Sequence, residues 1–206
     1  MRVLIACEFS GIVRESFAKR GHDAWSIDLL PTEKPGNHIQ GDISTGILER
    51  RRSIHWDLMI AHPPCTYLAV SGAGWFYHPK DKHLPIKERR PHPKFPNRQK
   101  DKFWAELFFM ALDNANIDKI CIENPIGTIS TSYRKPNQIV QPWQFGHGET
   151  KATCLWLKNL EKLQPTKIVG GRKPRIHYMS PGPDRAKARS KTYQGIADAM
   201  AEQWGC

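Results

Sequence analysis

Short apolar runs that end in turn residues dominate the first third of the chain. Residues 2–9 carry a continuous apolar run, which is typical of a strand buried on both faces of a parallel sheet. Ser10-Gly11 follows as a turn, and residues 12–18 place apolar side chains at helical spacing. Residues 24–27 are again apolar and end at Asp28. The pattern predicts a strand, a helix and a second strand parallel to the first.

The same pattern recurs further along the chain. Residues 39–43 predict a third strand with Asp42 near its tip, and residues 58–61 a fourth that two prolines end abruptly. Residues 120–122 and 154–157 are further short apolar strands. We therefore expect an α/β fold with a mostly parallel, Rossmann-like sheet, formed by residues 1–206 as a single domain.

Two helices complete the expected fold. Asp101 is placed to cap the first, and residues 194–200 form the second near the end of the chain. Apolar side chains at helical spacing in the first helix are expected to pack in the core: Trp104, Leu107, Phe108, Ala111 and Leu112.

Positive charge is concentrated in two segments. The 206 residues include 31 Lys and Arg against 20 Asp and Glu, a net charge of +11. The summed net charge of residues 72–102 and residues 167–191 exceeds the net charge of the whole chain. The remaining residues are therefore close to neutral. Basic residues interleaved with aromatics suit phosphate contacts and base stacking. We expect a nucleic-acid partner, with residues 72–102 as a mobile loop without helix or strand; a solvated insertion is the alternative.

The cysteines point to a reducing compartment. There are five, an odd number, and none forms a Cys-x-x-Cys pair, which argues against a disulfide framework and a zinc site. Met1-Arg2 leads straight into the first strand, so no signal peptide is expected, and no apolar run approaches the length of a membrane span. These features predict a cytoplasmic protein without a metal site and leave its oligomeric state open.

Candidate chemistry lies where the strands end. A strand, a glycine turn, a helix and a strand ending in Asp28 form a nucleotide-binding pattern, in which the acid accepts ribose hydroxyls. The turn contains one glycine, Gly11, and a plain structural turn would show the same sequence pattern. Pro63-Pro64-Cys65 places a thiol in a stiff loop after a strand, where it serves as a nucleophile or as a buried turn cysteine. Glu123-Asn124-Pro125 repeats this arrangement after another strand.

These two loops resemble the cytosine-5 DNA methyltransferases, which carry Pro-Pro-Cys on one loop and Glu-Asn on another. The resemblance covers most of the chain and implies the S-adenosylmethionine-dependent methyltransferase type of fold. It implies that Cys65 is the nucleophile and that Glu123 contacts the base. The cofactor would be S-adenosylmethionine, and the implied cofactor-binding residues are Phe9, Ser10, Gly11, Asp28, Asp42 and Pro63. The implied substrate-binding residues are Pro64, Asn124, Lys151 and Thr153.

The chain departs from the family pattern in several places. Ile12 and Val13 follow the glycine turn where another glycine is usual, and Ile196 stands in the closing segment where the family has asparagine. His62 replaces a common glycine; it is expected to be a hydrogen-bonded turn residue, although it could tune Cys65. About forty residues separate Lys151 from the last helix, too few for a recognition domain of ordinary size. The resemblance is therefore to a compact, phage-like member.

The implied reaction is methylation of carbon 5 of cytosine in DNA. A thiolate of Cys65 would add to carbon 6, and a Glu123 kept protonated by burial would contact ring nitrogen 3. Cytosine in RNA or in a free nucleotide is an alternative substrate. A non-catalytic nucleic-acid-binding module and a Rossmann-type NAD oxidoreductase are rival functions, the latter expecting a fuller glycine fingerprint.

Overall fold

A seven-stranded sheet forms the centre of the computed structural model, which describes residues 1–43 and 55–205. Within these residues the strand order is β3-β2-β1-β4-β5-β7-β6. β1 to β5 run parallel, whereas β7 runs antiparallel to both of its neighbours. The strands are β1 Arg2–Ala6, β2 Asp23–Asp28, β3 His38–Gln40, β4 Leu58–Ala61, β5 Lys119–Pro125, β6 Gln138–Val140 and β7 Thr153–Lys158.

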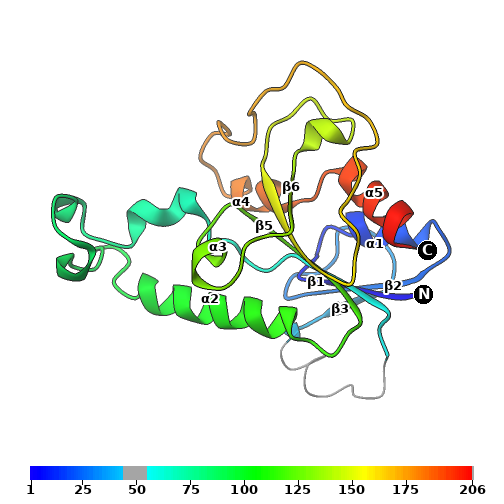
Figure 1. Ribbon diagram of the computed structural model, residues 1–206, viewed down its shortest axis with the longest axis horizontal. Coiled ribbons are helices and arrows are strands. Elements are labelled where there is room, and N and C mark those ends of the chain that lie inside the picture. The colour runs from blue at the N-terminus through cyan, green and yellow to red at the C-terminus, as the bar shows by residue number, and fades with distance from the viewer. Residues whose placement is uncertain (44–54, 206) are drawn as a thin grey trace.

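Helices cover both faces of the sheet (Figure 1). α1 and α5 pack together on one face, where Val3 and Ile5 of β1 point, and α2 covers the other face with Leu4 and Ala6. The α-helices are α1 Ile12–Ala18, α2 Arg98–Asp113, α3 Ile129–Ser132, α4 Arg185–Ser190 and α5 Gln194–Trp204. Short 3-10 helices are η2 Val70–Trp75, η3 Pro79–Asp81, η4 Ile86–Glu88 and η5 Pro142–Gln144.

The predicted fold class is confirmed: the chain is an α/β protein with a mostly parallel, Rossmann-like sheet, in which β7 is inserted in reverse between β5 and β6. Two strands are shorter than expected. β1 ends at Ala6, because Cys7 adopts a left-handed conformation with φ 58° that leaves the extended strand geometry. β3 ends at Gln40, so Asp42 lies two residues beyond its tip.

The basic lobe, which we define as residues 76–97, projects from one end of the molecule (Figure 1). The expectation of no helix in residues 72–102 is wrong, because 3-10 helices form there and α2 begins at Arg98. Asn97, not Asp101, precedes the first residue of α2. Inside the lobe Arg90 forms a bidentate ion pair with Asp81, at 2.6 and 2.9 Å, and lowers the pKa of that carboxyl.

The expected core face of α2 is also wrong in part. Leu112 is buried and Phe108 half-buried, but Trp104, Leu107 and Ala111 are exposed. The helix instead buries Phe109 together with Leu112. Spacing alone fits several faces of an aromatic-rich helix, and the sheet selects the one it contacts. No helix among the described residues has the length and apolarity needed to cross a membrane.

Candidate active site

The loop after β4 and the end of β5 meet at one edge of the sheet. β4 and β5 are parallel neighbours, with Ala61 opposite Ile122, so the residues that follow leave the sheet at the same place. The buried Asn124 fixes the two segments to each other by donating from Nδ2 to the carbonyl of Pro63, at 2.8 Å. Two sequence segments almost sixty residues apart therefore form one site.

His62 and Glu123 form a buried pair in this site. Nδ1 of His62 lies 2.9 Å from Oε2 of Glu123, and the side chains are only 9% and 12% exposed. The prediction that His62 is a hydrogen-bonded residue is confirmed. Burial raises the pKa of Glu123, but the hydrogen bond and charge of His62, with Lys151, bring it below its usual value. The expectation that burial keeps Glu123 protonated is therefore wrong for this arrangement.

Cys65 lies close enough to Glu123 for the charge of that carboxylate to affect its thiol. Burial is the main cause that raises the pKa of the Cys65 thiol, and the negative charge of Glu123 raises it further. Lys151 and Arg189 act in the opposite direction. The thiol is therefore protonated at neutral pH in this arrangement, and it becomes a nucleophile only when the balance of nearby charge changes.

Lys151 and Thr153 flank this site at the start of β7. Nζ of Lys151 donates to the carbonyl of Arg189 at 2.8 Å and lies 5.8 Å from the ring centre of Tyr193. Thr153 is buried and donates to the carbonyl of Lys151, at 3.2 Å. The second basic segment thus reaches the site through Arg189, which sequence spacing did not reveal.

A cavity of about 260 Å³ opens beside the site, at the ends of β1, β2 and β3. Two predicted cofactor residues, Asp28 and Asp42, line it together with Pro64. Pro63 is not among the lining residues. The other lining residues are Cys7, Ile27, Leu29, Gly41, Ile43 and Phe108. A lining of apolar side chains with two carboxylates suits a planar base joined to a sugar with free hydroxyls.

The predicted cofactor loop borders a smaller cavity of about 40 Å³. Its lining residues are Cys7, Glu8, Phe9, Ser10, His62, Ser190, Lys191 and Thr192. The loop is covered by the end of the second basic segment, because Nζ of Lys187 lies 5.3 Å from the ring centre of Phe9. Glu33 pairs with Lys187 and Lys191, at 2.9 and 2.6 Å. Phe9 and Ser10 therefore lie between the sheet and a basic cover.

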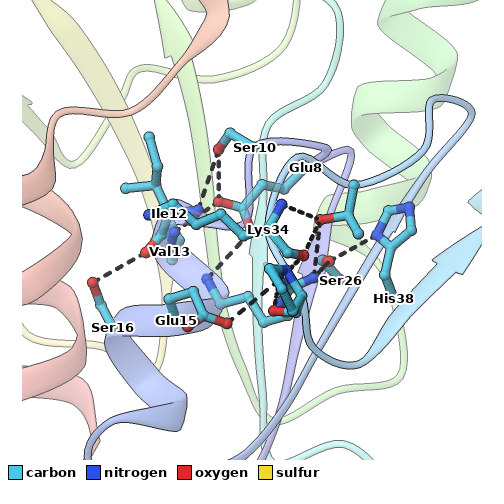
Figure 2. A network of polar contacts seen from close by, with 12 residues as sticks. Glu8, Ser10, Ile12, Val13, Glu15, Ser16, Ser26, Lys34 and His38 are labelled. Carbon is cyan, nitrogen blue, oxygen red and sulfur yellow. Dashed lines mark hydrogen bonds and ion pairs between the residues drawn. The ribbon is translucent and has the colours of Figure 1, made fainter.

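Glu8 is a functional candidate that the sequence analysis missed. Figure 2 shows its buried carboxylate beneath the loop, at the first turn of α1. It accepts hydrogen bonds from the backbone N–H groups of Val13 and Arg14 and from the Ser10 hydroxyl, at 2.7, 3.2 and 3.2 Å. In dinucleotide-binding proteins the corresponding helix N-terminus binds the pyrophosphate. Here the Glu8 carboxylate occupies the N-terminus of α1. The sequence signal that could have identified Glu8 is its position directly before the Phe-Ser-Gly turn.

A glycine is required at position 11 because of its backbone conformation and because of the nearby side chain of Arg14. Its φ is 68°, and a Cβ added there would lie 2.8 Å from Nη2 of Arg14. Arg14 is 1% exposed and donates to the carbonyls of Lys34 and Pro35, at 2.8 and 2.9 Å. The turn beside the cavities is therefore held from below by a buried guanidinium.

Comparisons with known proteins found similar solved structures but no similar sequence. No protein-family model and no curated protein matches the sequence. One similar structure is a protein described as a DNA modification methyltransferase encoded within an E. coli prophage, at 14% identity and TM-score 0.47, covering 82% of this chain and 51% of that one. Another is DNMT2 of Spodoptera frugiperda, at 13% identity and TM-score 0.45, covering 87% and 59%. The chain thus spans little more than half the length of either.

Proposed function

We propose that the protein is an S-adenosylmethionine-dependent methyltransferase that acts on carbon 5 of cytosine in DNA through a covalent adduct with Cys65. The observation that carries this proposal is the meeting of Cys65 and Glu123 at the carboxyl ends of β4 and β5. The cavity bordered by Asp28 and Asp42 opens at the same edge and contacts Pro64, the residue next to the thiol. A nucleophile, a base contact and a nucleoside-sized cavity are therefore contiguous.

The residues around the two cavities fit this cofactor better than a dinucleotide. Asp28 would accept the ribose hydroxyls and Asp42 would contact the adenine, while Phe9 and Ser10 would border the amino-acid portion. Glu8 at the start of α1 disfavours a pyrophosphate and suits a cofactor that carries positive charge. When bound, S-adenosylmethionine supplies an electrophilic methyl group.

The chain's own residues would activate the base. Cytosine carbon 5 is a weak nucleophile until a thiolate adds to carbon 6 and makes it enamine-like. Lys151 and Arg189 favour the thiolate of Cys65, whereas the ionised Glu123 opposes it. A proton placed on Glu123 therefore serves twice: it lets Glu123 donate to ring nitrogen 3, and it removes the charge that keeps the thiol protonated.

DNA is the proposed substrate because the positive charge lies where a polyanion would approach. The basic lobe carries exposed Lys82, Lys87 and Lys94 beside the exposed rings of Trp75 and Phe95. Lysines and aromatic rings together support phosphate contacts and base stacking. A base within a duplex would have to be flipped out to reach Cys65, at a cost of roughly a few kcal/mol. RNA and free nucleotide remain the alternative acceptors.

Radiolabelled S-adenosylmethionine offered with duplex DNA, single-stranded DNA, tRNA and dCMP tests the proposal. We expect 5-methylcytosine in DNA. Cys65→Ala and the size-matched Cys65→Ser should both lower transfer by about 10³-fold or more, because the activating adduct is lost. Both should bind S-adenosylhomocysteine within about twofold of the wild type in calorimetry, since neither loses a cofactor contact. Full activity in Cys65→Ala would exclude the covalent mechanism.

A further inference from the structure

His62 stands between the proposed base site and the small cavity. Its Nδ1 contacts Glu123 of β5, while its ring lines the cavity beside the loop after β1. Nε2 is buried and has no hydrogen-bond partner within the part of the chain that the structure describes. A buried ring nitrogen of this kind is normally satisfied by water or a ligand. The cavity of about 40 Å³ is large enough for a water molecule.

The hydrogen bond defines which atom carries the proton. Because the pKa of Glu123 is lowered, its carboxylate is the acceptor, and Nδ1 of His62 must be the donor. Nε2 is then free to accept a proton from the cavity. A neutral imidazole that gains a proton at one nitrogen can release one from the other, so the ring connects the cavity to Glu123.

The charged groups around His62 come from several elements. Glu8 and Cys7 face the cavity from the loop after β1, and Lys191 faces it from the segment after α4. Glu8 is bound to backbone N–H groups of α1, and Lys191 pairs with Glu33. On the other side lies Glu123, under the influence of Lys151. Carboxylates therefore lie on both sides of the ring.

We propose that His62 is a positioning residue that holds Glu123 in place and delivers to it, from the small cavity, the proton that Glu123 passes to the target base. This inference rests on the proposed function and extends it. The structure gives Glu123 as an anion, so a donor to ring nitrogen 3 must first receive a proton. His62 is the neighbour that contacts the Glu123 carboxylate at hydrogen-bond distance and also reaches a cavity.

The proton and electron balance is simple. The imidazolium form of His62 gives its Nδ1 proton to Glu123 and becomes neutral. Cys65 loses its thiol proton to solvent water, and the resulting thiolate forms a bond to carbon 6. The electron pair of the carbon 5–carbon 6 double bond shifts to the carbon 4–carbon 5 bond, the pair of the carbon 4–nitrogen 3 double bond moves onto nitrogen 3, and nitrogen 3 takes a proton from Glu123, which is left ionised. Water in the cavity, in exchange with solvent, restores the proton on His62. No oxidant or reductant is involved.

The contact itself can be tested without any activity. Glutamate labelled with ¹³C at the side-chain carboxyl allows the Glu123 titration to be followed by NMR, with Glu123→Gln to assign the signal. His62→Gly removes the hydrogen bond and leaves burial as the main influence, so the titration midpoint of Glu123 should rise by about one pH unit or more. His62→Gln keeps an N–H donor and should stay closer to the wild type. An unchanged midpoint in His62→Gly overturns the inference.

Proton delivery is tested by the kinetics of the same variants. Glutamine can hold Glu123 but cannot carry a proton, so His62→Gln should lower kcat by about 10²-fold with KM nearly unchanged. His55→Gln, at a histidine that is 80% exposed and outside both basic segments, is the control and should match the wild type. If the wild type is active and His62→Gln is equally active, proton delivery by His62 is refuted, while the proposed methyltransferase function stands. A wild type that transfers no methyl group to any acceptor refutes the proposed function, whatever the NMR titration shows.

Discussion

Glu8 and Glu123 are both buried carboxylates, and their partners give them different roles. Glu8 is held by two backbone N–H groups of α1 and by the Ser10 hydroxyl, so it is part of the scaffold beneath the proposed cofactor loop. Among the described residues Glu123 has one side-chain hydrogen-bond partner, His62, whose own proton can move. At the scale of single residues, the partner decides whether a buried acid supports the fold or takes part in chemistry.

Glu8→Ala should destabilise the protein. It removes the acceptor of two otherwise unpaired N–H groups at the start of α1, so we expect the free energy of unfolding to fall by about 1 to 2 kcal/mol in urea denaturation. Glu15→Ala is the control: Glu15 is only half-buried in the same helix and pairs with Arg14 at 3.4 Å, and it should cost less than about 1 kcal/mol. Equal losses would contradict the role of Glu8.

Among the elements, α5 depends on its contact with the loop before β7. Gly195, in its first turn, donates its backbone N–H to Nε2 of His147 at 2.9 Å. A Cβ on Gly195 would collide with the carbonyl oxygen of Phe145. Gly195 is therefore required for a steric reason, whereas the buried Ile196 packs in the core.

Gly195→Ala should lower stability because the backbone of the preceding loop has to move. We expect a loss of about 1 to 3 kcal/mol, the usual cost of overpacking, measured by urea denaturation. Gly170→Ala adds the same methyl group where no atom lies within 4 Å, and it should change stability by less than about 0.5 kcal/mol. Similar losses in both variants would mean that the contact with Phe145 is relieved without cost.

At the scale of the whole molecule, the two basic segments take different places. Most of the first forms the projecting lobe (Figure 1). In the second, Lys187 lies over the ring of Phe9, and the carbonyl of Arg189 accepts a hydrogen bond from Lys151. Arg98, the first residue of α2, donates to the carbonyl of Thr66 at 2.6 Å, and its guanidinium lies 5.1 Å from the ring centre of Phe76 in the lobe. The lobe is thus connected through Arg98 to the loop that carries Cys65.

Removing charge from the lobe should weaken DNA binding and its salt dependence together. For Lys82→Ala, Lys87→Ala and Lys94→Ala combined, each lost phosphate contact should reduce the slope of log affinity against log salt by roughly 0.9. Fluorescence anisotropy over a salt series measures this slope. The control removes three exposed lysines outside both segments, Lys19, Lys135 and Lys162, and should leave it unchanged. Equal slopes for the two triple variants would assign DNA binding elsewhere.

Much of the fold and part of the site could be predicted from sequence. β4, β5 and the core of β1 were predictable because strands buried on both faces are continuous apolar runs that prolines or polar residues end. β6 was not, because its three residues, Gln138–Val140, carry no such run and pair only with β7. The reversed direction of β7 was equally invisible, because a strand's apolar pattern is the same in both directions.

The sequence by itself determined where the candidate residues would gather: Cys65, Glu123, Asp28 and Asp42 stand at or within a few residues of the carboxyl ends of strands, and the carboxyl ends of parallel strands share one edge of the sheet. Only the tertiary structure decided the charge states, because these depend on distances between segments far apart in the chain. His62 lies 61 positions from Glu123; burial alone would raise the pKa of Glu123, and the hydrogen bond and charge of His62 together with Lys151 bring it below its usual value. Proton positions follow from three-dimensional contacts, which no local pattern encodes.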